Sequence, residues 1–378
     1  MMAQPLGVAL LRRAVLAADD VLYGPLLRPL IFRRSAQDAH EAILRMMRWA
    51  DQQRLLRNLF DVANHVAFAP CPVQVGGVTL ESPLILAAGL IKGDGFESEE
   101  AALAAVRRGD NVMPGWWSMA RLVGPAEFGS FTRWPRMGNP GTVVWRDAAT
   151  RSTQNRVGLR NPGAHAAAEF LTMRRDRLPA QYGINVAISP GVENTNAQAQ
   201  EVREAFSAFT ERGIQPAWFT LNLSCPNTED DPASNQTDAA TRLVCQAALD
   251  SVGDVPLWIK FGPNLADEQY RVLLRVAEET GVRAVVATNT LPADAPEPAG
   301  TQAGFGGGRL HGRAVQVAGL LAAEKAAHGY AVDIIGCGGV LDTASFQAFA
   351  TKGIHAVQYW SALVYGGPLA AAHIAAKG

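Results

Sequence analysis

The chain has 378 residues, of which 48% are hydrophobic, and its formal net charge is -1. A chain of this length and composition can bury a large core, so a barrel-sized domain with an appendage is expected. The nearly balanced charge and the lack of a basic run argue against nucleic acid as a partner. The cysteines form no CxxC pair, so neither a zinc site nor a disulfide framework is predicted, and a reducing cytoplasm is the expected compartment; they are Cys71, Cys225, Cys245 and Cys337.

The start of the chain is apolar but interrupted by charge. The pairs Arg12/Arg13 and Asp19/Asp20 break the apolar stretch before it reaches the roughly 18 to 20 residues that a membrane-spanning helix needs. The double arginine also falls where a secretory signal would have its apolar region. We therefore predict amphipathic helices, with an extension over residues 1–72 and a second domain over residues 73–378.

From about residue 82 onward, short β-rich runs alternate with segments of helical period, which predicts a parallel sheet. Eight such units in a domain of this length favour an α/β fold of the (β/α)8 (TIM) barrel type. A doubly wound sheet is the alternative, although no GxGxxG follows the first strand. The predicted strands are 84–88, 111–115, 183–188, 218–223, 257–262, 284–287, 333–336 and 356–360.

An irregular segment rich in Trp, Arg, Gly and Pro separates the second predicted strand from the third. A loop of about seventy residues inside a compact barrel is usually functional, so the active site is expected beneath it. Active sites of barrels lie at the C-terminal ends of the strands, where this chain places many polar residues and glycines. They are Lys92, Asn185, Asn222, Ser224, Cys225, Asn227, Lys260, Thr288, Asn289, Thr290, Gly338, Gly339 and Ser361.

Two of these residues carry reactive groups. A lone buried cysteine is usually an apolar filler, but Cys225 stands beside Pro226 and other polar groups at a strand end, where a thiolate can act as base or nucleophile. No histidine occupies such a strand end, so proton abstraction is favoured over nucleophilic catalysis. Lys260 would stabilise negative charge that develops on a cofactor or substrate, and a salt bridge in the barrel mouth is its alternative role.

The remaining strand-end residues suit a ligand with a flat ring and a phosphate. Several asparagines in one pocket match a heterocycle, because each amide offers both a donor and an acceptor. The glycines of "IIGCGGV" and Ser361 of "VQYWSALVYGGP" predict an anion site made of backbone N–H groups. Each asparagine could instead be a turn residue, and each glycine a tight turn.

These motifs resemble, in order and spacing, those of the FMN-dependent dihydroorotate dehydrogenases. The matching stretches are "AAGLIKGDG", "NRVGLRNPG", "LNLSCPNT", "IKFGPNL", "ATNTL", "IIGCGGV" and "VQYWSALVYGGP", so that the resemblance covers nearly the whole chain. Near the start, "YGPLLRPLIFRRSAQDAH" resembles the helical extension of the membrane-associated class that uses quinone.

The resemblance implies a mechanism in which Cys225 removes a proton from C5 of dihydroorotate while a hydride leaves C6 for N5 of FMN. Lys260 would stabilise the reduced flavin near its N1 and O2 edge. The implied FMN contacts are Ala88, Gly89, Lys92, Ser118, Asn185, Lys260, Thr288, Gly338, Gly339, Trp360 and Ser361. The implied substrate contacts are Lys92, Asn155, Asn222, Asn227, Asn289 and Thr290.

The resemblance also implies peripheral attachment to the cytoplasmic side of a membrane, with quinone as the acceptor in pyrimidine biosynthesis. The apolar residues expected to face lipid or quinone are Leu10, Leu11, Val15, Leu26, Leu27 and Leu30, and the arginines expected near head groups are Arg12, Arg13, Arg33 and Arg34. In the alternative arrangement, these helices pack on the barrel or on a second subunit.

The chain departs from the family pattern at several positions. In the quinone class the base is normally serine, whereas cysteine is typical of the soluble class, which lacks the extension. Two other functions therefore stay open: a flavin enzyme for another cyclic amide or activated alkene, and a non-catalytic flavin-binding protein. The other departures are Ile91 for aspartate, Leu159 for phenylalanine, Arg160 for asparagine, Ala362 for glycine, Gly141 and Val143 for arginines, and the bulky Trp116 and Trp117 at the second predicted strand end.

Overall fold

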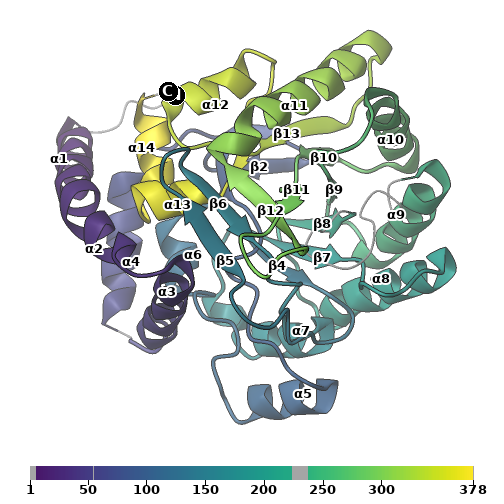
Figure 1. The fold of residues 1–378 in the computed structure, drawn as a ribbon, viewed down its shortest axis with the longest axis horizontal. Coiled ribbons are helices and arrows are strands. Elements are labelled where there is room, and N and C mark those ends of the chain that lie inside the picture. The colour runs from purple at the N-terminus through teal and green to yellow at the C-terminus, as the bar shows by residue number, and fades with distance from the viewer. Residues whose placement is uncertain (1–5, 54, 224–236, 378) are drawn as a thin grey trace.

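The computed structural model describes residues 6–53, 55–223 and 237–377, and its central feature is a closed barrel (Figure 1). Within this part of the chain, eight strands pair in parallel in the order β10-β13-β14-β3-β4-β7-β8-β9. The predicted (β/α)8 barrel is confirmed, and the doubly wound alternative is wrong. The strands are β3 (Leu84–Leu86), β4 (Ala126–Phe131), β7 (Tyr182–Ala187), β8 (Trp218–Asn222), β9 (Leu257–Phe261), β10 (Ala284–Ala287), β13 (Asp333–Cys337) and β14 (Val357–Tyr359).

Helices surround the barrel, and several of them begin at a side-chain cap. Ser98, Asn194, Thr237 and Asp342 each accept a hydrogen bond from a backbone N–H of the first turn, a donor that has no partner within the helix. The helices that follow barrel strands are α5 (Glu99–Arg107), α6 (Ser118–Leu122), α7 (Ala164–Thr172), α8 (Thr195–Thr210), α9 (Asp238–Val252), α10 (Asp267–Thr280), α11 (Gly308–His328), α12 (Thr343–Ala350), α13 (Ser361–Gly366) and α14 (Ala370–Lys377), with a short 3-10 helix at Arg175–Arg177.

The second barrel strand lies further along the chain than the sequence predicted. Residues 111–115 form no strand, and the strand that pairs between β3 and β7 is β4. Glu127 and Gly129 interrupt the apolar pattern of β4, and a carboxylate is not expected in a core strand. In the structure Glu127 is fully buried and accepts hydrogen bonds inside the barrel. This buried, hydrogen-bonded carboxylate is the reason why the sequence of β4 did not resemble a core strand.

The N-terminal end of the barrel is closed by two stacked tryptophans. The rings of Trp218 and Trp258 lie 4.6 Å apart at an interplanar angle of 15°. The indole N–H of Trp258 donates to the carbonyl of Gly76, in the hairpin of β1 (Val73–Val75) and β2 (Val78–Leu80). Because this end is filled, a ligand can enter the barrel only from the opposite, C-terminal end.

A second, antiparallel sheet lies over the C-terminal end of the barrel, and the two insertions that follow β4 and β10 build it together. In Figure 1 its strands cross in front of the barrel. The irregular segment predicted as a functional insertion is thus partly ordered into strands, and it runs over residues 132–181, since β4 takes up part of the predicted range. Its strands are β5 (Val144–Asp147), β6 (Ser152–Asn155), β11 (Leu291–Asp294) and β12 (Gln302–Gly307).

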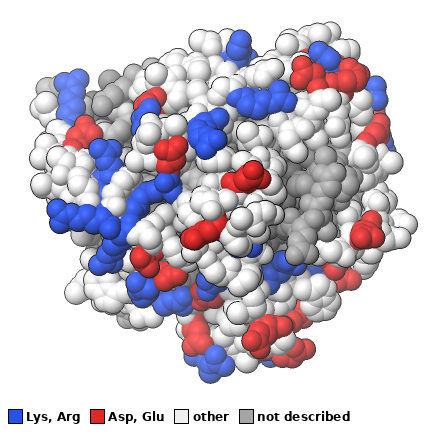
Figure 2. Space-filling view, in the orientation of Figure 1, with Lys and Arg blue, Asp and Glu red and all other residues white. Residues whose placement is uncertain are grey.

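Helices from the start of the chain lie together along one side of the barrel, in purple at the left of Figure 1. Figure 2 shows several Lys and Arg side chains on the same side of the molecule. No helix in the described part of the chain has the length and apolar character to cross a membrane. The helices are α1 (Leu6–Leu22), a π-helical turn at Tyr23–Leu27, α2 (Arg28–Phe32), α3 (Ala36–Ala50) and α4 (Leu56–Ala67).

Side-chain contacts hold α1 against the rest of the protein. The Arg12 guanidinium is buried and donates to the carbonyls of Val66 and Phe68, at the end of α4. His373 of α14 pairs with Asp19 at 2.9 Å. The expectation that Arg12 lies near lipid head groups is therefore wrong, because its charge is used inside the protein to satisfy the open C-terminal carbonyls of a helix.

The end of α3 is attached to the barrel through Asp51. Its carboxylate accepts hydrogen bonds from the Asn111 side chain and from the backbone N–H groups of Gly115 and Ser118, each at 2.8 Å. Burial raises the pKa of Asp51, and these hydrogen bonds act in the opposite direction. The alternative arrangement, in which the helices pack on the barrel, thus holds for one face of the extension.

Candidate active site

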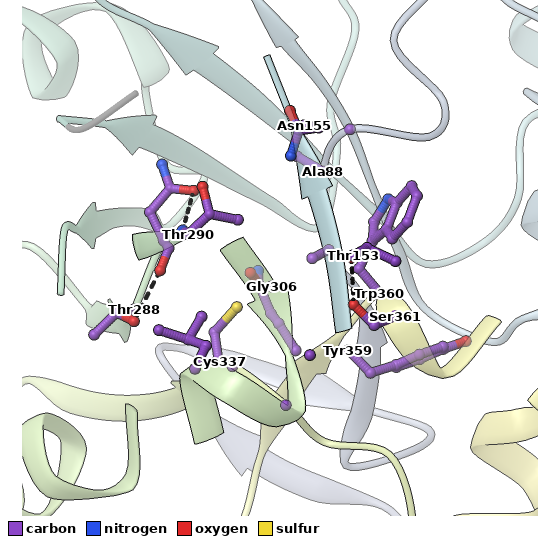
Figure 3. A pocket seen from close by; sticks show the side chains of 18 of the residues that line it. Ala88, Thr153, Asn155, Thr288, Thr290, Gly306, Cys337, Tyr359, Trp360 and Ser361 are labelled. Carbon is purple, nitrogen blue, oxygen red and sulfur yellow. Dashed lines mark hydrogen bonds between the residues drawn. The ribbon is translucent and has the colours of Figure 1, made fainter. Parts of the chain in front are cut away.

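A cavity lies at the C-terminal ends of the barrel strands, beneath the antiparallel sheet (Figure 3). Its lining comes from the ends of seven barrel strands, from β6 and β12 above, and from α3 of the extension. This is the face on which barrel enzymes bind their ligands. The residues that were predicted for the site and line this cavity are Ala88, Gly89, Lys92, Asn155, Asn222, Lys260, Thr288, Asn289, Thr290, Gly338, Gly339, Trp360 and Ser361.

The described lining of the cavity contains cations and no carboxylate. Lys92 follows β3, and Lys260 is nearly buried near the end of β9, where its ammonium donates to the side-chain oxygen of Gln358 at 2.8 Å. His40 reaches the cavity from α3, and burial together with the charges of Lys92 and Arg160 lowers its pKa to about 4. His40 is therefore neutral near pH 7, and the positive potential of the cavity comes from the lysines.

A row of polar side chains crosses the cavity and joins the ends of β4, β8 and β10. The Asn222 amide donates to the Ser130 hydroxyl at 3.4 Å, and the Asn289 amide donates to the Asn222 oxygen at 3.3 Å. The Asn289 oxygen in turn accepts the backbone N–H of Thr290 at 2.8 Å. Donors and acceptors thus alternate along one edge of the cavity, an arrangement suited to a flat ring with alternating carbonyl and N–H groups.

The opposite part of the cavity combines hydroxyl groups with closely packed glycines. The hydroxyls of Ser361 and Thr153 lie 2.7 Å apart and face each other in Figure 3. A Cβ at Gly338 would lie 2.5 Å from that of Ala314, and Gly339 has a φ of 67°, so a larger residue would be strained at either position. This backbone and its hydroxyls fit the requirements of a phosphate site.

Five residues predicted for the site do not line the described cavity. Ser118 lies in α6, where its backbone binds Asp51, and Asn185 is buried below the cavity with its amide donating to Glu127 at 2.7 Å. The side-chain oxygen of Asn185 has no hydrogen-bond partner among the described residues. Ser224, Cys225 and Asn227 fall outside the described residues.

The two tryptophans at the second predicted strand end do not reach the cavity. Trp116 and Trp117 are 3% and 4% exposed, belong to the hydrophobic core around α6, and do not line the cavity. Trp116 packs edge-on against Phe170 at 5.9 Å. The sequence placed them at a strand end because it predicted the second strand too early in the chain. Leu159 does line the cavity, with a φ of 55°, so this departure from the family pattern lies in the binding site itself.

Several lining residues were missed from the sequence. Ser130 lies at the end of β4, and the same error that predicted the strand too early selected Ser118 instead. Gln358 stands inside a strand, where a polar residue between apolar neighbours was a usable signal. Thr153, Gly306 and His40 come from the covering sheet and from the extension, and their approach to the barrel depends on pairings between segments far apart in the sequence.

The family model for dihydroorotate dehydrogenase matches residues 71–377. The chain belongs to the dihydroorotate dehydrogenase family. A relative from Chromobacterium violaceum, a dihydroorotate dehydrogenase (quinone), is 32% identical over 361 residues, which cover 91% of this chain and 94% of the relative. Another from Chloroflexus aurantiacus, of the same name, is 28% identical over 93% of this chain and 94% of the relative. Enzymes of the dihydroorotate dehydrogenase family depend on a flavin.

Solved structures of the dihydroorotate dehydrogenase of Eimeria tenella share the fold. The ligand-free form superposes with a TM-score of 0.68 at 22% identity, over 89% of this chain and 93% of that chain. The complex with ferulenol gives a TM-score of 0.66 at 21% identity, over 85% of this chain and 89% of that chain. Together with the closed barrel of parallel strands, these likenesses establish the architecture of the chain.

Proposed function

We propose that this protein is an FMN-dependent dihydroorotate dehydrogenase that oxidises dihydroorotate to orotate and passes the electrons to a quinone. The observation that carries the proposal is the cavity itself, in which two lysines, a row of amides and a glycine-rich anion site converge beneath the covering sheet. The names of the relatives point to the same reaction and to the same class of acceptor.

The described residues fit FMN in two respects. Ser361, Thr153 and the backbone at Gly338 and Gly339 offer hydroxyl and N–H groups to a phosphate, with no carboxylate among the described lining residues. The buried Asn185 oxygen, which has no partner within the described chain, is a polar group of the kind that a ligand satisfies. When bound, FMN would supply the hydride acceptor. The other proposed contacts are Ala88, Gly89, Lys92, Lys260, Thr288 and Trp360, whereas Ser118 is left out and Ser130 takes its place.

The protein's own residues would bind and deprotonate the substrate. Asn222 and Asn289, already joined by a hydrogen bond between the ends of β8 and β10, would bind the carbonyl and N–H edge of the ring, and Lys92 would attract its carboxylate. Cys225 follows β8 in the sequence, and we assign it the role of general base at C5. Lys260 would hold positive charge beside the group that receives the hydride. Asn155, Asn227 and Thr290 complete the proposed set of substrate contacts.

The outer face of the N-terminal helices supports peripheral attachment to the cytoplasmic side of a membrane. Arg13, Arg33 and Arg34 are exposed on the same helices, beside a surface of large apolar side chains. Val15, which was also expected to face lipid, is partly buried against the Leu16 cluster instead. The exposed apolar residues are Leu10, Leu11, Val21, Leu22, Leu26, Leu27, Leu30, Met46, Trp49, Leu55, Leu59 and Val62.

Charging this apolar surface is expected to detach the protein from lipid without disturbing the barrel. The double substitution Leu26→Glu and Leu30→Glu should lower co-sedimentation with vesicles that contain anionic lipid by roughly tenfold or more, because each glutamate removes apolar burial and adds repulsion. Met173→Glu with Leu243→Glu, which change exposed apolar residues on the barrel, form the matched control. Equal binding by both variants would show that the extension does not attach to the membrane.

To test the proposed function, the flavin-loaded protein is mixed with dihydroorotate under anaerobic conditions, and the visible absorbance of the flavin is recorded over time. We expect bleaching within seconds. A bound flavin that stays oxidised would instead favour a different cyclic amide or an activated alkene as substrate, which the unusual Leu159 in the cavity wall would then help to explain. A protein that takes up no FMN would exclude the proposal, and with it any flavin chemistry.

A further inference from the structure

Directly below the cavity, the barrel interior contains a buried carboxylate. Glu127 of β4 is 0% exposed, and its two oxygens accept four hydrogen bonds from other strands. Asn185 of β7 donates at 2.7 Å, and β8 contributes the indole N–H of Trp218 at 3.0 Å and the hydroxyl of Thr220 at 2.7 Å. The fourth donor is the side-chain amide of Gln358 from β14, at 3.0 Å.

The identity of these partners indicates the charge of Glu127. An indole N–H and an amide NH₂ group can only donate, so they match an ionised carboxylate, which only accepts. A protonated acid would need an acceptor, and of the four partners only the Thr220 hydroxyl can also accept, whereas the indole and the two amide NH₂ groups donate. A buried anion is costly unless it is paired and fully hydrogen-bonded, so a nearby cation is expected.

That cation is Lys260, and Gln358 connects it to Glu127. The Gln358 amide donates its NH₂ group to the Glu127 carboxylate at 3.0 Å, and its oxygen accepts from the Lys260 ammonium at 2.8 Å. Because a carboxylate can only accept, it fixes the orientation of the amide, and the oxygen must then face the lysine. Within the described part of the chain, Lys260 has no carboxylate at ion-pair distance, so the amide is the link between the two charges.

The chain of contacts from Glu127 through Gln358 to Lys260 runs between two layers of the barrel interior. Asn185 pairs with Thr220 in the strand ladder, and Asn222, which lines the cavity, pairs with Lys260 one layer higher. Lys260 and Gln358 both reach the cavity, whereas Glu127 does not line it. The carboxylate thus lies behind the cavity and acts on a ligand only through its field and through the groups that it orients.

We infer that Glu127 is a positioning residue, which orients the Lys260 ammonium through Gln358 and partly offsets its charge, and so sets how readily the bound flavin accepts electrons. The inference rests on the proposed function. A polar network that only held the strands together would need no connection between Glu127 and Lys260. Here the two are connected, and Lys260 faces the cavity. Electrostatic effects of such a pair are strong because the surroundings exclude water.

The experiment compares Glu127→Gln with Thr220→Val in the flavin-loaded protein. Both remove a hydrogen-bonding feature of the same network, but only the first removes the charge. We expect Glu127→Gln to shift the midpoint potential of the flavin to a more positive value and to strengthen the binding of reduced flavin relative to oxidised flavin by several-fold. Thr220→Val should leave the potential unchanged even where it lowers the melting temperature by a similar amount.

A second variant keeps the test open if Glu127→Gln does not fold. Gln358→Met removes the amide oxygen that faces the Lys260 ammonium and leaves the carboxylate in place, so only part of the offset is lost and the potential should rise by a smaller amount. Potentials that equal those of Thr220→Val in both variants would overturn the inference, with the proposed function intact. If the unsubstituted protein binds no FMN, the proposed function fails and the inference falls with it.

Discussion

Replacing Cys225 with alanine is expected to leave a yellow protein whose flavin is reduced by dihydroorotate roughly 10²- to 10⁴-fold more slowly, the usual contribution of a positioned base. In the sequence, Cys225 comes shortly after Asn222, which ends β8 and lines the cavity. Stopped-flow absorbance under anaerobic conditions measures the rate directly. The affinity for orotate, measured through the change that orotate causes in the flavin spectrum, should change little. The reason is that the base contributes to the transition state more than to ground-state binding.

The matched variant is Cys225→Ser, which restores the residue typical of the quinone class. It should recover a large part of the lost rate. The pH at which its rate of flavin reduction increases should be higher than in the unsubstituted protein, because an alcohol gives up its proton less readily than a thiol. A Cys225→Ala variant as fast as the unsubstituted protein would remove Cys225 from the mechanism. Equal and complete loss in both variants would indicate a role in packing instead of proton transfer.

The fold could be predicted because the barrel repeats one simple pattern. Seven of the eight strands were placed by short apolar runs between helices of regular period, and each of these runs contains or overlaps the observed strand. The eighth failed at β4, where Glu127 and Gly129 interrupt the apolar pattern. A carboxylate in a core strand is stable only because side chains of three other strands donate to it, and that network is visible only after the barrel has closed.

The candidate site could be predicted where it lies at strand ends, because a parallel barrel brings all of those ends to one face. Lys260, Asn289 and Gly339 meet in the cavity although they are far apart in the sequence. The parts that were missed come from contacts with no local signature. His40 reaches the cavity only because α3 packs on the barrel, and Gly306 only because β12 pairs with β6.

Replacing Lys260 with methionine is expected to weaken FMN binding by roughly 10- to 100-fold, since the loss of a hydrogen bond that involves a charged group costs about 1.5 to 3 kcal/mol. Methionine keeps the length of the side chain and removes the ammonium. Reduction by dihydroorotate should slow as well, because the positive charge that stabilises the reduced flavin is lost. Fluorescence titration of the apoprotein with FMN measures the first effect, and anaerobic stopped-flow absorbance the second.

Lys352→Met provides the control, because Lys352 is exposed and does not line the cavity. Removing Lys260 also leaves Glu127 without its nearby cation, so the melting temperature of the apoprotein should fall in Lys260→Met and not in Lys352→Met. The two effects can be separated, because Gln358→Met disconnects Lys260 from Glu127 while the ammonium stays. Should Lys260→Met bind FMN as tightly as Lys352→Met does, the ammonium has no part in flavin binding, and its pairing with Glu127 would be purely structural.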